Sequence, residues 1–134
     1  LFRKCHTFPV VRDSPDRTAL RQALDHLERD DVLLVYPEGT RSPDGQLHHA
    51  HAGAGFIARH SGAPIVPVAS WGSDKVLPRG AWIPRRADVH QRIGEPFRLP
   101  TRGQDGRPLS NQAAADLMMS RVAALLPTAS RPAA

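Results

Sequence analysis

Apolar residues recur along the chain with two different spacings, and these spacings predict where helices and strands lie. Between Arg17 and Arg29 the apolar residues fall on one helical face and the charged residues on the other. The apolar positions are Ala19, Leu20, Ala23, Leu24 and Leu27. The residues before this stretch favour a helix start, because Ser14 can cap it, Pro15 suits the first helical position and Asp16 favours the positive end of the dipole. We therefore predict a packing helix that carries no chemistry.

The segment Val32–Tyr36 has no polar position at all, since four aliphatic residues are followed by a tyrosine. Such a run is typical of a strand that is covered on both faces of a sheet. Pro37 then ends the strand because it has no N–H to donate. Shorter runs predict three further strands, at Phe8–Arg12, at Ile65–Ala69 and at Asp88–Ile93. Pro67 lies inside one of them and implies an edge position or a bulge.

Two more helices are expected, one from His49 to His60 and one from Asn111 to Leu126. Gly62 ends the first and Ser110 caps the second. Turn-rich sequences lie at 42–45 and 101–110. We place residues 1–126 in one partial α/β domain and predict that 127–134 form a disordered tail of small residues.

The chemistry of the chain is concentrated directly after the apolar run, in Glu38, Gly39, Thr40 and Arg41. Ligands in α/β sheets bind at the carboxyl ends of strands. Arg41 can hold a phosphate or carboxylate through two parallel hydrogen bonds, and Gly39 lets a ligand approach the backbone. A right-handed crossover would bring Arg12 to the same sheet edge. The alternative interpretation is a polar turn with a Glu–Arg pair inside it.

The positive charge of the chain is unevenly distributed. The net charge is +5, and up to Ser70 there are eight acidic and eight basic residues, so the whole excess lies from Trp71 onward. Arginine predominates, which suits phosphate groups, although a solvated basic face gives the same composition. No apolar run approaches the roughly 20 residues of a membrane span, so any membrane contact of this chain is peripheral. The single Cys5 excludes an internal disulfide and is compatible with a reducing cytoplasm.

Two Trp residues lie among basic residues in the loop from Trp71 to Arg86. This amphipathic mixture favours a membrane interface. A basic loop with both rings packed against the protein fits the sequence equally well.

The histidines His48, His49 and His51 are candidates for a metal site, but no acidic or Cys partner has matching spacing, and a polar loop is the simpler interpretation. The stretch Gly53–Ala58 formally fits a dinucleotide-binding pattern. That pattern must follow directly on a strand, which the histidines do not form. We therefore predict no nucleotide loop and no metal.

The run from Tyr36 to Ser42 resembles the third conserved block of the glycerolphosphate acyltransferases of the 1-acylglycerol-3-phosphate acyltransferase type, which usually reads Phe-Pro-Glu-Gly-Thr-Arg-Ser. Phe8–Arg12 resembles the second block of that family, whose Arg is a phosphate ligand. Ile65–Ala69 resembles the fourth, a strand with an internal proline. The three blocks occur in the family's order between Phe8 and Pro96.

The resemblance implies part of the glycerolphosphate acyltransferase fold, a mixed sheet flanked by helices, without its amino-terminal portion. It implies transfer of a fatty acyl group from acyl-CoA or acyl carrier protein, as co-substrate and without a cofactor, to a lysophospholipid such as lysophosphatidic acid, giving phosphatidic acid at the cytoplasmic face of a membrane. The implied acceptor-binding residues are Arg12, Glu38, Gly39, Thr40 and Arg41. His51 would replace a basic residue that the family often has after the third block, but it is charged only when protonated.

The family's catalytic block, a His and an Asp separated by four residues, precedes the second block. The resemblance therefore places the catalytic pair upstream of Leu1, and a chain that opens on Leu rather than Met indicates an amino-terminally truncated sequence. His26 and Asp31 have the right spacing but the wrong place, and we interpret them as a solvated helix end.

Three rival interpretations remain open from the sequence. The acceptor could be a lysolipid with another headgroup. The chain could be a non-catalytic, anion-binding remnant of an acyltransferase. It could also bind nucleic acid through its basic half, although the scarcity of aromatic residues outside the Trp loop argues against this class of partner.

Overall fold

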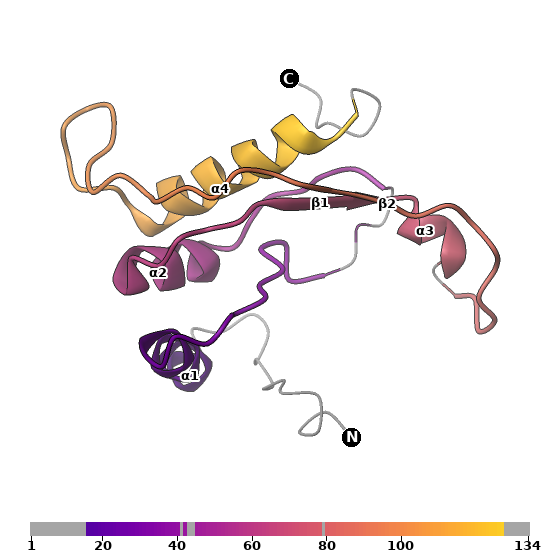
Figure 1. The fold of residues 1–134 in the computed structure, drawn as a ribbon, viewed down its shortest axis with the longest axis horizontal. Coiled ribbons are helices and arrows are strands. Elements are labelled where there is room, and N and C mark those ends of the chain that lie inside the picture. Colours follow the sequence, from indigo (N-terminus) through magenta and orange to yellow (C-terminus); the bar gives the residue numbers. More distant parts are fainter. Residues whose placement is uncertain (1–15, 41, 43–44, 79, 128–134) are drawn as a thin grey trace.

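A computed structural model of the chain describes residues 16–40, 42, 45–78 and 80–127. Figure 1 shows the helices and the sheet in chain order. The elements are α1 (Arg17–Glu28), α2 (Ala52–Ser61), β1 (Val68–Trp71), α3 (Ser73–Val76), β2 (His90–Ile93) and α4 (Asn111–Leu125). Within these residues, no helix has the length and apolar character needed to cross a bilayer. The expected strand at 8–12 and the tail from 128 onward lie outside the described residues.

Helix α1 has the predicted amphipathic face. Ala19 and Ala23 are buried, whereas Arg17, Arg21 and Asp25 are exposed. The predicted cap was wrong, because the helix begins later and Asp16 is its N-cap. The Asp16 carboxylate accepts a hydrogen bond from the Ala19 amide at 3.0 Å. An aspartate is as good a cap as a serine, and here it also places a negative charge at the positive end of the dipole.

Helices α2 and α4 lie side by side and form the centre of the packing (Figure 1). Gly55 makes this possible, because a Cβ atom there would lie 1.9 Å from the backbone oxygen of Asn111. The buried residues around the contact are small apart from one methionine: Ala50, Ala54, Ala58, Ala114, Ala115 and Met119. Gly53–Ala58 is thus part of a packing helix, which accounts for its small residues without a nucleotide. Gly62 ends α2 with a φ of 59°, as its sequence predicts.

Strands β1 and β2 form an antiparallel pair in which Val68 faces Ile93 and Trp71 faces His90. The strand predicted at Ile65–Ala69 is displaced toward the carboxyl end, since Pro67 cannot donate to a ladder. Its carbonyl instead accepts a bond from the Gly94 amide at 2.9 Å. Ile65 makes only an isolated bridge, to Phe97.

The prediction of a buried strand at Val32–Tyr36 was wrong for the described part of the chain. The segment is extended but joins no sheet, and the exposed fractions are 98% for Val32, 72% for Leu34 and 74% for Tyr36. An apolar strand is buried only when neighbouring strands pair with both of its edges and other elements cover its faces. The neighbour predicted from the sequence, ending at Arg12, lies outside the described residues.

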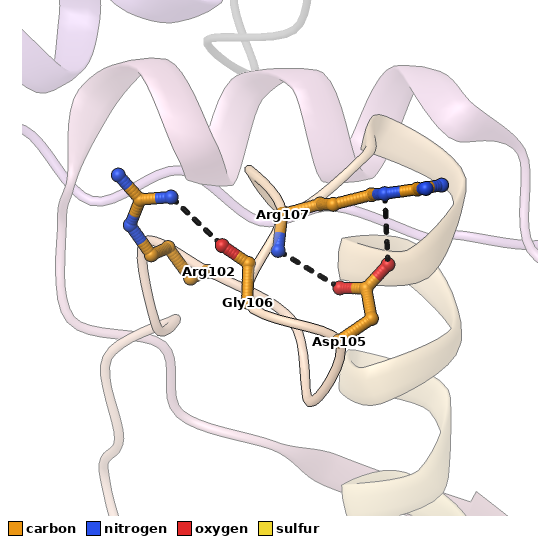
Figure 2. Close-up of polar contacts among 4 residues, drawn as sticks. All are labelled: Arg102, Asp105, Gly106 and Arg107. Carbon is orange, nitrogen blue, oxygen red and sulfur yellow. Dashed lines mark hydrogen bonds and ion pairs between the residues drawn. The ribbon is translucent and has the colours of Figure 1, made fainter.

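The turn-rich stretch before α4 forms a small hairpin, shown in Figure 2. The Arg102 guanidinium donates to the Gly106 carbonyl at 2.7 Å, and the Arg107 amide donates to the Asp105 carboxylate at 3.0 Å. The hairpin leads into α4, whose N-cap is Ser110 as predicted. The Ser110 hydroxyl accepts from the Ala113 amide at 3.0 Å.

Candidate functional site

The turn after Val32–Tyr36 is built by backbone hydrogen bonds. The Gly39 amide donates to the Tyr36 carbonyl at 3.0 Å, and Gly39 has a φ of +66°, a conformation that side chains with a Cβ rarely adopt. The Pro37 carbonyl accepts from the His51 amide at 2.9 Å. This last bond joins the turn to the start of α2. We call residues 38–40 the acceptor turn.

Glu38 is held inside the acceptor turn by one of its oxygens. Its Oε2 atom accepts a hydrogen bond from the His48 amide at 3.1 Å. The sequence could not predict this contact of His48, because every residue except proline has the same backbone amide. The side chain of Glu38 is half-buried, so the bond fixes the carboxylate without removing it from solvent.

The ring of His51 lies against Gly39. A Cβ atom on Gly39 would be 3.1 Å from Cδ2 and 3.3 Å from Nε2 of this imidazole. His51 is also the N-cap of α2, and its side chain makes no capping bond. The positive end of the α2 dipole therefore lies at the acceptor turn, a location that favours anions. Both His51 and Thr40 are exposed and accessible to a ligand.

The predicted binding residues are thus partly brought together. Glu38, Gly39 and Thr40 form the acceptor turn, and His51 joins it from α2. Arg12 and Arg41 lie outside the described residues, so their convergence stays a prediction. Thr40, which immediately precedes Arg41, ends this described part of the turn.

An open groove of about 570 Å³ lies further along the chain, between the 45–46 segment and α3. Its lining comes from three segments: Gly45 and Gln46; Trp71, Gly72, Asp74 and Lys75; and Ala87, Asp88 and His90. Trp71 is half-buried here because its ring stacks on His90, with centroids 5.5 Å apart, and the Arg92 guanidinium lies 5.3 Å from the Trp71 ring. This ring is packed against the protein.

His26 and Asp31 are hydrogen-bonded to each other, with Nδ1 and Oδ2 2.8 Å apart. Both side chains are about half exposed, at 46% and 53%. The pair closes the carboxyl-terminal end of α1, where the Asp31 amide also donates to the His26 carbonyl at 3.1 Å. It lies at the opposite end of Val32–Tyr36 from the acceptor turn, so it occupies the helix end that the sequence predicted.

His48, His49 and His51 follow one another in the connection that enters α2. Within the described ranges, no three side chains of His, Cys, Asp or Glu are grouped so that they could hold a metal ion. Near the start of α2 the exposed Thr40 hydroxyl and the exposed His51 imidazole can contact an anion. This arrangement is suited to holding a phosphate and a neighbouring hydroxyl.

Comparison with known proteins gives concordant matches. The Acyltransferase family model matches residues 1–71. The chain is 32% identical over 96 residues to the 1-acyl-sn-glycerol-3-phosphate acyltransferase of Bacillus subtilis, covering 71% of this chain and 45% of that protein. It is 29% identical to a lyso-ornithine lipid O-acyltransferase of Pseudomonas aeruginosa, covering 100% of this chain and 58% of that protein.

A solved structure has the same fold. The crystal structure of the 1-acyl-sn-glycerophosphate acyltransferase PlsC from Thermotoga maritima matches with a TM-score of 0.65 and 29% identity, over 80% of this chain and 42% of that one. The chain thus spans about half the length of these relatives.

Proposed function

Since the chain belongs to the acyltransferase family, we propose that the protein transfers a fatty acyl group from acyl-CoA or acyl carrier protein to the free hydroxyl of lysophosphatidic acid, giving phosphatidic acid. The observation that carries this proposal is the junction of the acceptor turn with the start of α2, where Gly39 and His51 meet. Relatives named for this acceptor, in Bacillus subtilis and Thermotoga maritima, support the choice of substrate.

The acceptor turn would bind the phosphate end of the lipid. The exposed Thr40 hydroxyl offers a hydrogen-bond donor, and the positive end of α2 adds a favourable field for the anion. Arg41 follows Thr40 directly, and Arg12 is the residue that the family resemblance assigns to the same phosphate. Two guanidinium groups holding one phosphate would orient as well as bind it.

Glu38 would orient its neighbours, because a carboxylate cannot itself bind a phosphate. One oxygen is used by the His48 amide, which leaves the other for an arginine or for a glycerol hydroxyl. His51 would add a second contact to the headgroup, stronger when the imidazole is protonated. The close fit of the His51 ring to Gly39 keeps that imidazole at the acceptor turn.

The chemical step would be direct transfer. A general base takes the proton of the acceptor hydroxyl, its oxygen attacks the thioester carbonyl, and the carbon–sulfur bond breaks to release the thiol, which takes up a proton. Holding the hydroxyl beside the thioester can contribute roughly 7 to 11 kcal/mol in favourable cases. In our proposal the acceptor-turn residues supply this positioning. We do not assign the base to His26 and Asp31, because this half-exposed pair lies at the carboxyl-terminal end of α1, at the opposite end of Val32–Tyr36 from the acceptor turn.

A second acceptor is favoured by one comparison. One relative, which matches along 100% of this chain, is named for lyso-ornithine lipid. An acyltransferase for that lipid would use the same transfer chemistry with a different headgroup contact.

The protein would work as a peripheral protein at the cytoplasmic face of a membrane, because both proposed acceptors are membrane lipids. To test the function, the protein is expressed from its complete gene, including whatever precedes Leu1, as in every activity assay below. It is purified and incubated with labelled acyl-CoA and either lysophosphatidic acid or lyso-ornithine lipid. We expect labelled phosphatidic acid to form faster than labelled ornithine lipid. A preference for lyso-ornithine lipid would replace the first acceptor by the second, and no product with either would refute the proposal.

A further inference from the structure

The loop that follows α3 carries two apolar side chains with almost no protein around them. The exposed fraction is 96% for Trp82 and 78% for Ile83. Adjoining exposed apolar residues form a patch, and larger apolar patches rimmed by polar residues mark contacts with another molecule or a membrane. The two Trp residues of this region therefore differ, because Trp71 is packed against His90 whereas Trp82 is free of such packing.

The ends of this loop are held together. The Arg85 amide donates to the Val76 carbonyl at 2.7 Å, and the Ala81 amide donates to the Pro78 carbonyl at 3.0 Å. Val76 is the last residue of α3, so the loop is closed at the helix and projects from it. Figure 1 shows it extending from α3 at the opposite end of the molecule from α1 and α2.

Exposed basic residues lie close to the apolar pair in the sequence. Arg85, Arg86 and Lys75 are all exposed. From Ser73 to Ile93 the sequence has five Lys or Arg residues against two Asp residues. The two acidic residues, Asp74 and Asp88, line the groove beside Trp71. A Trp-containing tip flanked by arginines has the composition of segments that lie at the boundary between headgroups and acyl chains.

We propose that the part of this loop from Gly80 to Arg86 is the surface by which this protein docks on an anionic lipid bilayer, with Trp82 and Ile83 inserted and Arg85 and Arg86 on the headgroups. The partner is a bilayer because the apolar pair needs an acyl phase and the arginines need a nearby layer of negative charge. The groove between α3 and the 45–46 segment would then open beside the membrane surface. The inference rests on the proposed function in one respect, namely that the acceptor is a membrane lipid.

Trp fluorescence separates the two rings, because the chain has only two Trp residues. In Trp71→Phe the emission comes from Trp82 alone, and in Trp82→Phe it comes from Trp71 alone. We expect vesicles of phosphatidylcholine with 30% phosphatidylglycerol, the composition chosen for the test, to shift the emission of the first variant of the full chain to shorter wavelength. The emission of the second variant should stay unchanged.

Binding to the same vesicles measures the charge contribution. Arg85→Gln should lower the partition coefficient about fivefold, which corresponds to about 1 kcal/mol per arginine near an anionic surface. Trp82→Ala should lower it about tenfold. The matched control is Arg107→Gln, since Arg107 is also a highly exposed arginine but lies in the hairpin before α4, and it should leave the partition coefficient unchanged.

An unshifted Trp82 emission, equal binding to pure phosphatidylcholine vesicles, or an equal effect of Arg107→Gln would overturn the proposal. If Trp82 emission responded to a single-stranded RNA in preference to the vesicles, the proposal would be overturned in favour of a nucleic-acid partner. Acyl transfer to lysophosphatidic acid in detergent micelles, without any bilayer, is measured in parallel. If Trp82→Ala keeps wild-type activity in micelles but binds vesicles more weakly, the docking loop is supported. If the wild-type protein and Trp82→Ala are both inactive in micelles while the wild-type protein still binds vesicles, only the proposed reaction is refuted.

Discussion

Replacing Gly39 by Ala perturbs the acceptor turn in two ways that can be separated. Alanine at a φ of +66° is strained by about 1 to 2 kcal/mol, and its Cβ atom would lie 3.1 Å from Cδ2 of His51. The imidazole must then move by a few tenths of an ångström. Gly106 is a matched control, because its φ is +75° and a Cβ atom there meets nothing within 4 Å. Gly106→Ala therefore reports the backbone strain alone.

We expect both variants to lose similar stability, with a melting temperature lower by about 4 to 8 °C as measured by circular dichroism. Only Gly39→Ala should affect the acceptor. Losing one hydrogen bond to the headgroup costs about 0.5 to 1.5 kcal/mol, so the KM for lysophosphatidic acid should rise about 2- to 13-fold while the KM for acyl-CoA stays the same. Assays are run well below both melting temperatures, so that unfolding does not contribute.

The variant His51→Ala completes the test. If the added methyl group acts through the imidazole, Gly39→Ala should have little further effect on the acceptor KM once His51 has been replaced. An acceptor KM that rises equally in Gly39→Ala and Gly106→Ala would show that strain alone is responsible. Multiplying effects of the two site substitutions would show that His51 and Gly39 act independently, and either result would refute the proposed geometry.

Three other predictions concern the rest of the chain. Arg12→Ala and Arg41→Ala should each raise the acceptor KM without changing the KM for acyl-CoA. In the double variant the acceptor KM should rise by less than the product of the two single increases, because both guanidinium groups hold one phosphate. An increase equal to that product in steady-state kinetics would contradict a shared ligand. His26→Ala should leave kcat unchanged and cost less than about 0.5 kcal/mol in urea unfolding, since its partner Asp31 is exposed, and a large fall in kcat would make this pair catalytic after all. Gly55→Ala should lower the melting temperature by about 10 °C or more, because its Cβ atom would meet the backbone of α4. Gly53→Ala in the same helix should be neutral or slightly stabilising. Equal changes in the two melting temperatures would refute the helix contact.

The helices could be predicted well because their signals are local. The apolar spacing in α1, the Ser110 cap of α4 and the left-handed Gly62 at the end of α2 all act within a few residues of where they occur. The start of α1 was misplaced for a related reason. Ser14 and Asp16 are both good caps, and the sequence alone does not rank them.

The strands could not be placed as well, because pairing depends on distant residues. The apolar run at Val32–Tyr36 predicts a buried strand, yet its burial requires neighbours that the described residues do not supply. Pro67 lies just before β1 because it has no N–H to donate. The sequence does not show which edge of this segment the partner, here Gly94, approaches. Trp71 and Trp82 have similar sequence contexts, and only the structure distinguishes them: Trp71 stacks on His90, whereas Trp82 is exposed.

The candidate site was found from residue type and family resemblance, and the structure added contacts that residue type does not reveal. Nothing in the sequence indicates that the His48 amide binds Glu38, or that the His51 ring lies on Gly39. Both contacts arise because the connection into α2 returns to the turn, where the His51 amide donates to the Pro37 carbonyl. The phosphate-binding role that we predict for Arg12 comes from the family resemblance alone, because no local pattern predicts it.

The central claim is that the acceptor turn and its arginines recognise a phosphate on the lipid. The most direct test is the ratio of kcat/KM for lysophosphatidic acid to that for the monoacylglycerol without the phosphate, in the wild-type protein and in Arg41→Ala. We expect a strong preference for lysophosphatidic acid that falls at least tenfold in the variant, while the rate with monoacylglycerol hardly changes. An identical ratio in both proteins would contradict it.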